Sequence, residues 1–178
     1  MGPVGVERPV PAVVLAAGAS TRFGSPKQRL LLEPVLERVR AARSVGEIVV
    51  VLGAHDVDVP VQTVRCPEWK LGPGASLRCG LAALADAEAA VVVLADGPGL
   101  HPEAIDRIVR AWRSGRDEVL AASYGGHRGH PVLIARSAWE KIPESGAREL
   151  GAALIRCDDL GDPGDVDYAD DLPVELRP

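Results

Sequence analysis

Apolar and polar residues follow one another along the chain in blocks that predict strands and helices in turn. Nearly uninterrupted apolar runs, typical of strands buried on both faces, occur at 12–16, 47–53 and 90–96, and 61–65 is predicted as a further strand. After Pro34, Ser76 and Pro102, apolar residues instead recur every three or four positions, as on one face of a helix. We expect the two prolines to stand at helix starts and Ser76 to cap the helix that follows it.

The second half of the chain is less regular but continues this alternation. Strands are expected over 118–124 and 130–136, on either side of the glycine-rich sequence GGHRG, and a last strand over 153–157. Short helices are expected over 137–142 and 146–151, before an acidic tail that is rich in turns. Strands that alternate with helices predict an α/β fold, a Rossmann-like three-layer sandwich around a mainly parallel sheet, with all 178 residues in a single domain.

One loop carries most of the chemistry that the sequence offers. The segment LAAGASTRFGSPKQ, residues 15–28, follows the first apolar run and combines glycines, hydroxyl residues and two cations. Such loops hold anionic groups through backbone N–H groups and cationic side chains. A P-loop needs lysine directly after its second glycine, but Lys27 comes three residues after Gly24, and Ser20 breaks the dinucleotide fingerprint GxGxxG. The nucleotidyltransferase signature LAAGxSxRxGxxKQ matches without a gap.

With this signature in place, the chain resembles the MobA-like NTP transferases, and within them the molybdenum cofactor cytidylyltransferase branch. Four further segments match the family in order: GASLRCGLAAL (74–84), VVVLADGPGL (91–100), GHRGHPVLIARSAW (126–139) and DVDYADDL (165–172). The resemblance implies a fold of the nucleotide-diphospho-sugar transferase type. It also implies transfer of an NMP unit from a nucleoside triphosphate to a phosphorylated acceptor, with release of pyrophosphate.

The resemblance assigns roles to individual residues. Those implied to bind the nucleotide are Leu15, Ala16, Ala17, Gly18, Ser20, Gly24, Ser76 and Arg78. Arg22 and Lys27 are implied as catalytic residues, since cations can offset the charge that builds on the phosphates during the transfer. The cofactor implied is Mg²⁺, which prefers oxygen ligands: Asp96, also a catalytic residue, and Asp167 would supply them, with Asp165 as a partner. No general base is assigned, because a phosphate acceptor is already ionised.

Donor and acceptor are also implied by the resemblance. Ala17, where guanylyltransferases of the family often carry glycine, favours CTP, and His130 belongs to a segment on the acceptor side. The acceptor implied is molybdopterin, with transient contact to a molybdoenzyme. The shortened segment after Lys27 and the unusual residues Gly97 and Tyr168 depart from the family pattern and leave other acceptors open, namely a sugar phosphate or a phospho-acid. A non-catalytic chaperone that binds the nucleotide or cofactor is the alternative from another class.

Composition narrows the class of protein. A net charge of −5 argues against a nucleic-acid partner, and no apolar run approaches the ~20 residues of a membrane span. With no signal-peptide pattern, we expect a cytoplasmic protein, a monomer or small homo-oligomer. Three scattered cysteines, Cys66, Cys79 and Cys157, predict buried, inert thiols in a reducing compartment. The spacing HxxH at 127–130 is compatible with zinc, but the sequence offers no evident fourth ligand.

Overall fold

A seven-stranded sheet forms the centre of the molecule in the computed structural model, which describes residues 7–177. The strand order is β3-β2-β1-β4-β6-β5-β7, and only β6 runs antiparallel to its neighbours. The strands are β1 (Val10–Ala16), β2 (Val45–Leu52), β3 (Gln62–Arg65), β4 (Ala89–Leu94), β5 (Val119–Tyr124), β6 (His127–Ala135) and β7 (Ala153–Arg156). All the predicted strands are present, within three residues at each end.

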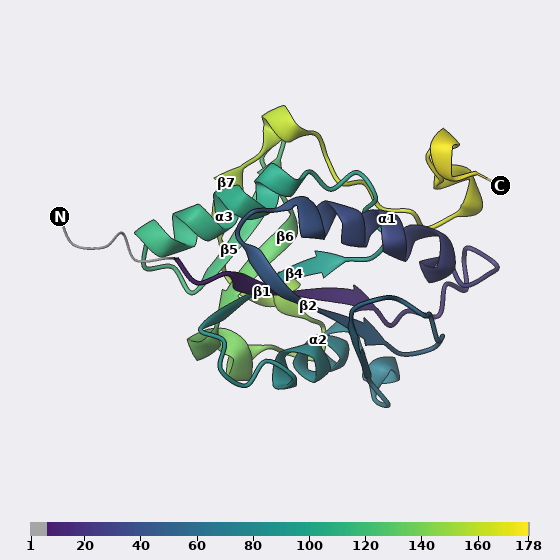
Figure 1. Ribbon diagram of the computed structural model, residues 1–178, viewed down its shortest axis with the longest axis horizontal. Coiled ribbons are helices and arrows are strands. Elements are labelled where there is room, and N and C mark those ends of the chain that lie inside the picture. The colour runs from purple at the N-terminus through teal and green to yellow at the C-terminus, as the bar shows by residue number, and fades with distance from the viewer. Residues whose placement is uncertain (1–6, 178) are drawn as a thin grey trace.

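Helices cover both faces of this sheet and complete three layers (Figure 1). On one face lie α1 (Gln28–Ala41) and α3 (Pro102–Ser114), and on the other lies α2 (Pro73–Ala82). Two separate apolar clusters result, one between the sheet and the α1–α3 layer and one between the sheet and α2. The predicted α/β three-layer fold with a mainly parallel sheet is therefore confirmed. Within residues 7–177, no helix has the length and apolar character that crossing a membrane requires.

The start of α1 differs from the prediction. The helix begins at Gln28 rather than at Pro34, which lies inside it. Proline lacks the N–H that an inner helix position normally uses, so the sequence favoured a start there. Packing outweighs this loss, because Leu31 and Leu32 in the additional first turn are almost completely buried. Tertiary contacts commonly override local propensity in this way.

Two further helix predictions are wrong. Ser76 does not cap α2 but lies buried inside it, because the helix already begins at Pro73 with Gly72 in the N-cap position. The segment 146–151 forms only the 3₁₀ turn Ala147–Glu149. The predicted short helix over 137–142 is present as the 3₁₀ helix Arg136–Lys141.

Helix α2 approaches the sheet closely at Gly80. A Cβ placed on Gly80 would lie 2.5 Å from Cγ1 of Val13 and 2.7 Å from Cγ2 of Val51, which are side chains of the neighbouring strands β1 and β2. Gly80 is buried, so the backbone of the helix itself packs against the sheet here. Glycine therefore serves a packing purpose within a helix, where its conformational freedom is otherwise unfavourable.

The last segment of the chain returns to the start of α1. Val166 and Leu172 form a third apolar cluster with Leu31, and the partly buried Phe23 and Leu176 pack against it. In Figure 1 this segment lies beside the beginning of α1, at the end of the molecule where the loop after β1 is found. The contact holds residues 166–172 next to the loop that carries the nucleotidyltransferase signature.

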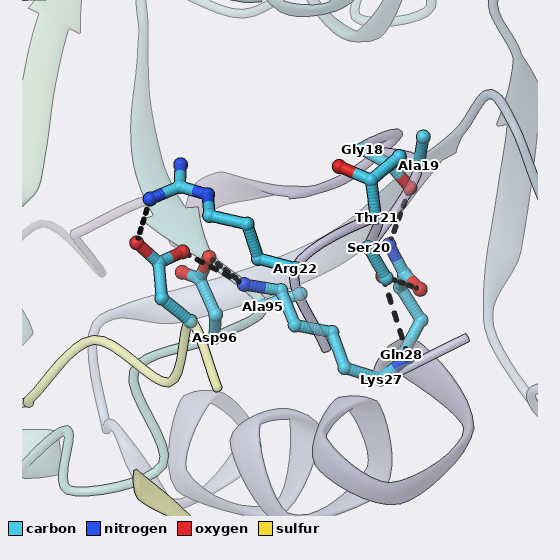
Figure 2. A pocket seen from close by; sticks show the side chains of 10 residues that line it. Gly18, Ala19, Ser20, Thr21, Arg22, Lys27, Gln28, Ala95 and Asp96 are labelled. Carbon is cyan, nitrogen blue, oxygen red and sulfur yellow. Dashed lines mark hydrogen bonds and ion pairs between the residues drawn. The ribbon is translucent and has the colours of Figure 1, made fainter. Parts of the chain in front are cut away.

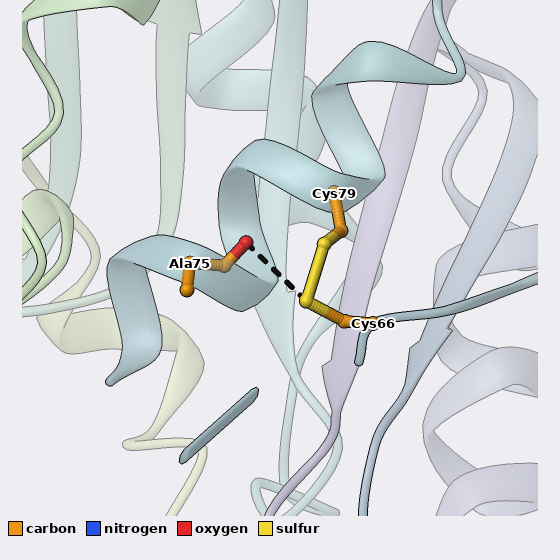
Figure 3. The surroundings of a disulfide bond; sticks show 3 residues. All are labelled: Cys66, Ala75 and Cys79. Atoms are coloured by element: carbon orange, nitrogen blue, oxygen red, sulfur yellow. Dashed lines mark hydrogen bonds between the residues drawn. A yellow bond between two sulfur atoms is a disulfide. The ribbon is translucent and has the colours of Figure 1, made fainter. Parts of the chain in front are cut away.

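The cysteines depart from the prediction of free thiols. Cys66, which follows β3, forms a disulfide with Cys79 of α2, and their Cα atoms lie 5.8 Å apart (Figure 3). The twelve residues between them turn back through a 3₁₀ turn and the first half of α2, and no local spacing motif signals this approach. Cys157 is a buried free thiol, as predicted.

Candidate active site

Three segments distant in sequence meet at the carboxyl ends of β1 and β4. The loop after β1 carries Arg22 and Lys27, Asp96 lies two residues beyond the end of β4, and Asp167 comes from the last segment of the chain. Together they line a cavity of about 250 Å³. Ligands of open α/β folds bind outside the carboxyl ends of the strands, so the cavity has the expected position for a substrate site.

The side chain of Lys27 joins the two carboxylates of this cavity (Figure 2). Its Nζ donates to Oδ2 of Asp96 at 2.9 Å and to the carbonyl oxygen of Val166 at 2.6 Å, and it lies 3.6 Å from Oδ1 of Asp167. Arg22 donates from Nη1 to Oδ2 of Asp167 at 2.7 Å. Two cations and two carboxylates thus neutralise one another when no substrate is bound.

The backbone fixes the last segment in this arrangement. The N–H of Val166 donates to the carbonyl oxygen of Asp96 at 3.0 Å, so the residue before Asp167 is attached directly to the loop after β4. Because Lys27 also binds the carbonyl of Val166, the position of Asp167 depends on both neighbouring segments. The Asp167 carboxylate is therefore held beside Asp96, although the two residues are far apart in the sequence.

The carboxyl group of Asp165 is affected by this cluster. Partial desolvation, followed by the negative charges of Asp96 and Asp167, raises the pKa of Asp165 above its ordinary value. Lys27 and Arg22 act in the opposite direction. Asp165 therefore lies within the electrostatic field of the two predicted metal ligands.

The predicted nucleotide-binding residues separate into four groups. Gly18 and Ser20 line the cavity together with Arg22, Lys27, Asp96 and Asp167. Leu15 lines a different cavity, while Ala16 and Ala17 are buried in the two cores. The structure does not bring the last group to either cavity: Gly24, Ser76 and Arg78.

Each residue in that last group has a structural position instead. Gly24 has a positive φ of 83° and ends the turn that follows Ser20, whose carbonyl accepts from the N–H of Gly24. Ser76 is buried inside α2. Arg78 donates from Nη1 to the carbonyl oxygen of Ile142 at 2.9 Å. Gly24 and Arg78 therefore stabilise segments near the cavities, and none of the three lines a cavity wall.

A second cavity, of about 590 Å³, lies on the α2 side of the same strand ends. Leu15, Leu77 and Leu94 provide apolar walls, and its polar lining includes His127, Arg128, His130 and Arg148. Arg128 donates to the carbonyl oxygens of Ala147, Arg148 and Leu150 and so fixes the turn that carries Arg148. No carboxylate is found among the described residues that line this cavity, so its charge is positive.

His130 lies in this second cavity, directly before the cis peptide bond that joins it to Pro131. Burial lowers the pKa of its imidazole below the ordinary value, and the Val92 carbonyl and the charge of Asp96 oppose this shift only in part. Its Nδ1 is buried without a partner in the described part of the chain. Burial therefore favours the uncharged form of the His130 imidazole.

The model of the MobA-like NTP transferase domain matches residues 12–160. The chain belongs to this family. It is 32% identical over 189 residues to a probable molybdenum cofactor guanylyltransferase from Mycobacterium ulcerans (strain Agy99), an alignment that covers 93% of this chain and 92% of that protein. Family membership is thereby confirmed. The cytidylyltransferase branch predicted from the sequence is not the one named for this relative or for its counterpart in Mycobacterium marinum.

Several solved structures superpose on most of the chain. The Rv0371c homologue from Mycobacterium sp. strain JC1 has a TM-score of 0.75 and 26% identity, covering 91% of this chain and 92% of that one. Rv0371c of Mycobacterium tuberculosis H37Rv in complex with manganese has a TM-score of 0.72 and 25% identity, covering 92% and 95%. More distant nucleotidyltransferases share the fold, which is of the predicted nucleotide-diphospho-sugar transferase type.

In this MobA-like chain the cavity also contains residues that the sequence analysis did not single out: Ala19, Thr21, Gln28 and Ala95. The sequence could have pointed to Gln28, because it is the last residue of the matched signature. In the second cavity, Arg148 lies outside every matched segment, so no sequence pattern pointed to it. Its position depends on Arg128, a long-range contact that the sequence does not encode locally.

The donor set of the MobA-like cavity suits a hard divalent cation. Asp96 and Asp167 offer carboxylate oxygens on either side of the Lys27 ammonium group, so the site already accommodates positive charge between them. No cluster of three or more histidine, cysteine or acidic side chains suited to a metal occurs within residues 7–177. Two carboxylates, completed by phosphate oxygens and water, are the usual set for Mg²⁺.

Proposed function

We propose that this protein transfers a nucleoside monophosphate from a nucleoside triphosphate to a phosphate group of a small acceptor, with release of pyrophosphate. The observation that carries the proposal is the position of Lys27 between Asp96 and Asp167, beside a glycine loop at the strand ends. Membership of the MobA-like family supports the same reaction. We further propose that all 178 residues act as one transferase unit.

The transfer exchanges one P–O bond for another. A phosphate oxygen of the acceptor attacks the α-phosphorus of the donor, and the bond from that phosphorus to the oxygen bridging the β-phosphate breaks. Pyrophosphate leaves with the electron pair. Because the attacking phosphate is already ionised, the proposal needs no general base, and the protein contributes mainly position and electrostatic stabilisation.

The charged residues of the cavity suit the positioning and stabilisation of phosphate groups. Backbone N–H groups of the loop at 18–20 would bind the triphosphate, and Lys27 and Arg22 would exchange their carboxylate partners for phosphate oxygens. Asp96 and Asp167 would hold Mg²⁺, with Asp165 beside them. When bound, the cation supplies charge neutralisation at the phosphates.

The second cavity is our candidate for the acceptor side. His127 and Arg148 are exposed at its rim, and His130 lies further inside, so an anionic acceptor finds donors there and no described carboxylate. The relatives named molybdenum cofactor guanylyltransferases support molybdopterin as this acceptor. The sequence and the relatives differ on the donor: Ala17 favoured CTP, whereas the names of the relatives favour GTP. We propose GTP, with GMP as the group transferred.

Pyrophosphate release tests the proposal. Wild-type protein and the Asp96→Asn variant are incubated with molybdopterin, Mg²⁺ and one of GTP, CTP, ATP or UTP. We expect release with GTP that needs both molybdopterin and Mg²⁺ and is lost in the variant. Release with CTP alone would overturn the choice of donor. Nucleotide binding without release from any of the four would overturn the enzymatic proposal and favour a non-catalytic binding protein.

A further inference from the structure

Three consecutive carbonyl groups of the glycine loop are each held by a donor from the start of α1 or from the connection after β2. The carbonyl of Ala17 accepts from the N–H of Ala54 at 3.1 Å. That of Gly18 accepts from Nε2 of Gln28 at 2.7 Å, and that of Ala19 lies 2.9 Å from Nε2 of His55. A carbonyl can only accept, so Nε2 of His55 carries the hydrogen.

These contacts determine where the N–H groups of the loop point. In a trans peptide the C=O of one residue and the N–H of the next point in opposite directions. With the carbonyls of residues 17–19 turned toward the body of the protein, the N–H groups of Gly18, Ala19 and Ser20 point away from it, on the cavity side. Within residues 7–177 none of these three N–H groups has a protein acceptor. They form a row of free donors of the kind that binds phosphate.

Gln28 also fixes the end of this row. Ser20 has a positive φ of 55°, the sole non-glycine residue with this conformation in the described chain. Its hydroxyl donates to Oε1 of Gln28 at 2.9 Å and accepts from the N–H of Lys27 at 3.3 Å (Figure 2). Non-glycine residues persist in this region when surrounding contacts over-determine them, often at ligand sites. Both polar atoms of the Gln28 side chain are therefore occupied by the loop.

We infer that Gln28 and His55 are positioning residues for the triphosphate, which they orient through the backbone of residues 18–20. Gln28 is 3% exposed, so its side chain acts through the loop rather than on the nucleotide. His55 lies on the connection after β2, outside every segment that suggested a function in the sequence. The inference rests on the proposed function, because it concerns how that site receives the phosphates of the donor.

Binding of Mg²⁺–GTP and Mg²⁺–pyrophosphate, measured by calorimetry, tests the inference. Gln28→Leu removes both contacts and His55→Leu removes one, and each is expected to weaken both ligands at least tenfold. His55→Gln places an amide nitrogen where Nε2 was and should recover most of the loss, which a purely structural role would not predict. For GTP turnover, the effect should fall on KM more than on kcat, since the loop binds phosphate before and during the transfer.

Two controls separate this effect from general destabilisation. His101→Leu removes the side-chain cap of α3, and Gln62→Leu changes an exposed residue of β3; both should bind the two ligands as wild type does. If Gln28→Leu does not fold, the comparison of His55→Leu with His55→Gln tests the inference by itself. Unchanged binding in His55→Leu, with a wild type that binds Mg²⁺–GTP, overturns this inference and leaves the proposed function intact. A wild type that binds no nucleoside triphosphate overturns both.

Discussion

Nζ of Lys27 lies 2.9 Å from Oδ2 of Asp96, so the cation expected to meet the donor phosphates is paired with the carboxylate expected to meet the metal. The Lys27 side chain is only 13% exposed. An unpaired ammonium group would be costly at such a position, and the pairing avoids this cost in the absence of substrate. Under the proposed function, substrate binding would exchange these partners: phosphate would pair with Lys27 and the divalent cation with Asp96.

Replacement of Lys27 tests this exchange. Lys27→Met keeps the length of the side chain and removes its charge. We expect kcat/KM for nucleotidyl transfer to fall by about 10²–10³-fold, the usual effect of removing one donor from developing negative charge. Pyrophosphate release gives the measurement. Lys70→Met, at an exposed lysine beside Trp69, is the matched control. A Lys27→Met enzyme within threefold of wild type would show that the phosphates do not need this cation.

Asp167→Asn should separate binding from stability. Its partner Arg22 is 64% exposed, and exposed ion pairs contribute about 0–1 kcal/mol, so the free energy of unfolding should change by less than about 1 kcal/mol. Binding of Mn²⁺–GTP, followed by calorimetry, should weaken at least tenfold because one carboxylate ligand is lost. Chelation of the metal should reduce wild-type binding to the same level. A variant that binds normally would contradict the assignment of Asp167 to the metal, and one that unfolds would contradict the small contribution of its ion pair to stability.

The sequence predicted the central sheet and the convergence of the charged residues well. Apolar runs such as the one at 90–96 identify buried strands without knowledge of their neighbours, and the strand ends then bring Asp96 to the loop after β1. Asp167 could be placed there only through the resemblance, since its position depends on the contact of Val166 with the loop after β4. The catalytic and metal-binding roles of these residues stay predictions.

The departures share a physical cause, which is contact between distant segments. Pro34 lies inside α1 because burial of Leu31 and Leu32 in the apolar core stabilises an additional helical turn before it. Cys66 and Cys79 meet because the chain reverses between them. Arg78, predicted at the nucleotide, instead binds the carbonyl of Ile142. None of these contacts has a signature in the residues next to it, so local patterns could not anticipate them.

His130 should make stability depend on pH. Its folded pKa is lowered by burial, whereas an unfolded histidine titrates near 6.5. Between pH 7.5 and 5.5 the unfolded chain therefore takes up more of a proton at this position than the folded protein does, and the free energy of unfolding falls by at most about 1.4 kcal/mol per pH unit. Urea unfolding at several pH values should show this slope in wild type and in His101→Asn. The slope should be smaller in His130→Asn; an equal slope there would assign the pH dependence to other groups.

Gly80→Ala should reverse the usual preference of helices for alanine. In an exposed helix this change stabilises by about 1 kcal/mol. At Gly80 the new methyl group would meet Val13 and Val51 at 2.5–2.7 Å, and overpacking of this kind costs about 1–3 kcal/mol. Thermal or urea unfolding measures the loss. Gly151→Ala is the control, because nothing lies within 4 Å of its added Cβ. A stabilised Gly80→Ala protein would mean that α2 can move away from the sheet.

The pairing of Arg22 with Asp167 joins positions 145 residues apart, and this separation matters while the protein is being made. On the ribosome, the glycine loop and Asp96 emerge long before the segment that packs against Leu31. Until that segment arrives, a nascent chain presents Arg22 without its counter-charge and Asp96 without the second carboxylate. The cavity beside Lys27 is thus completed only after residues 166–172 have emerged, and an unfinished chain lacks one of the two carboxylates proposed to hold the metal.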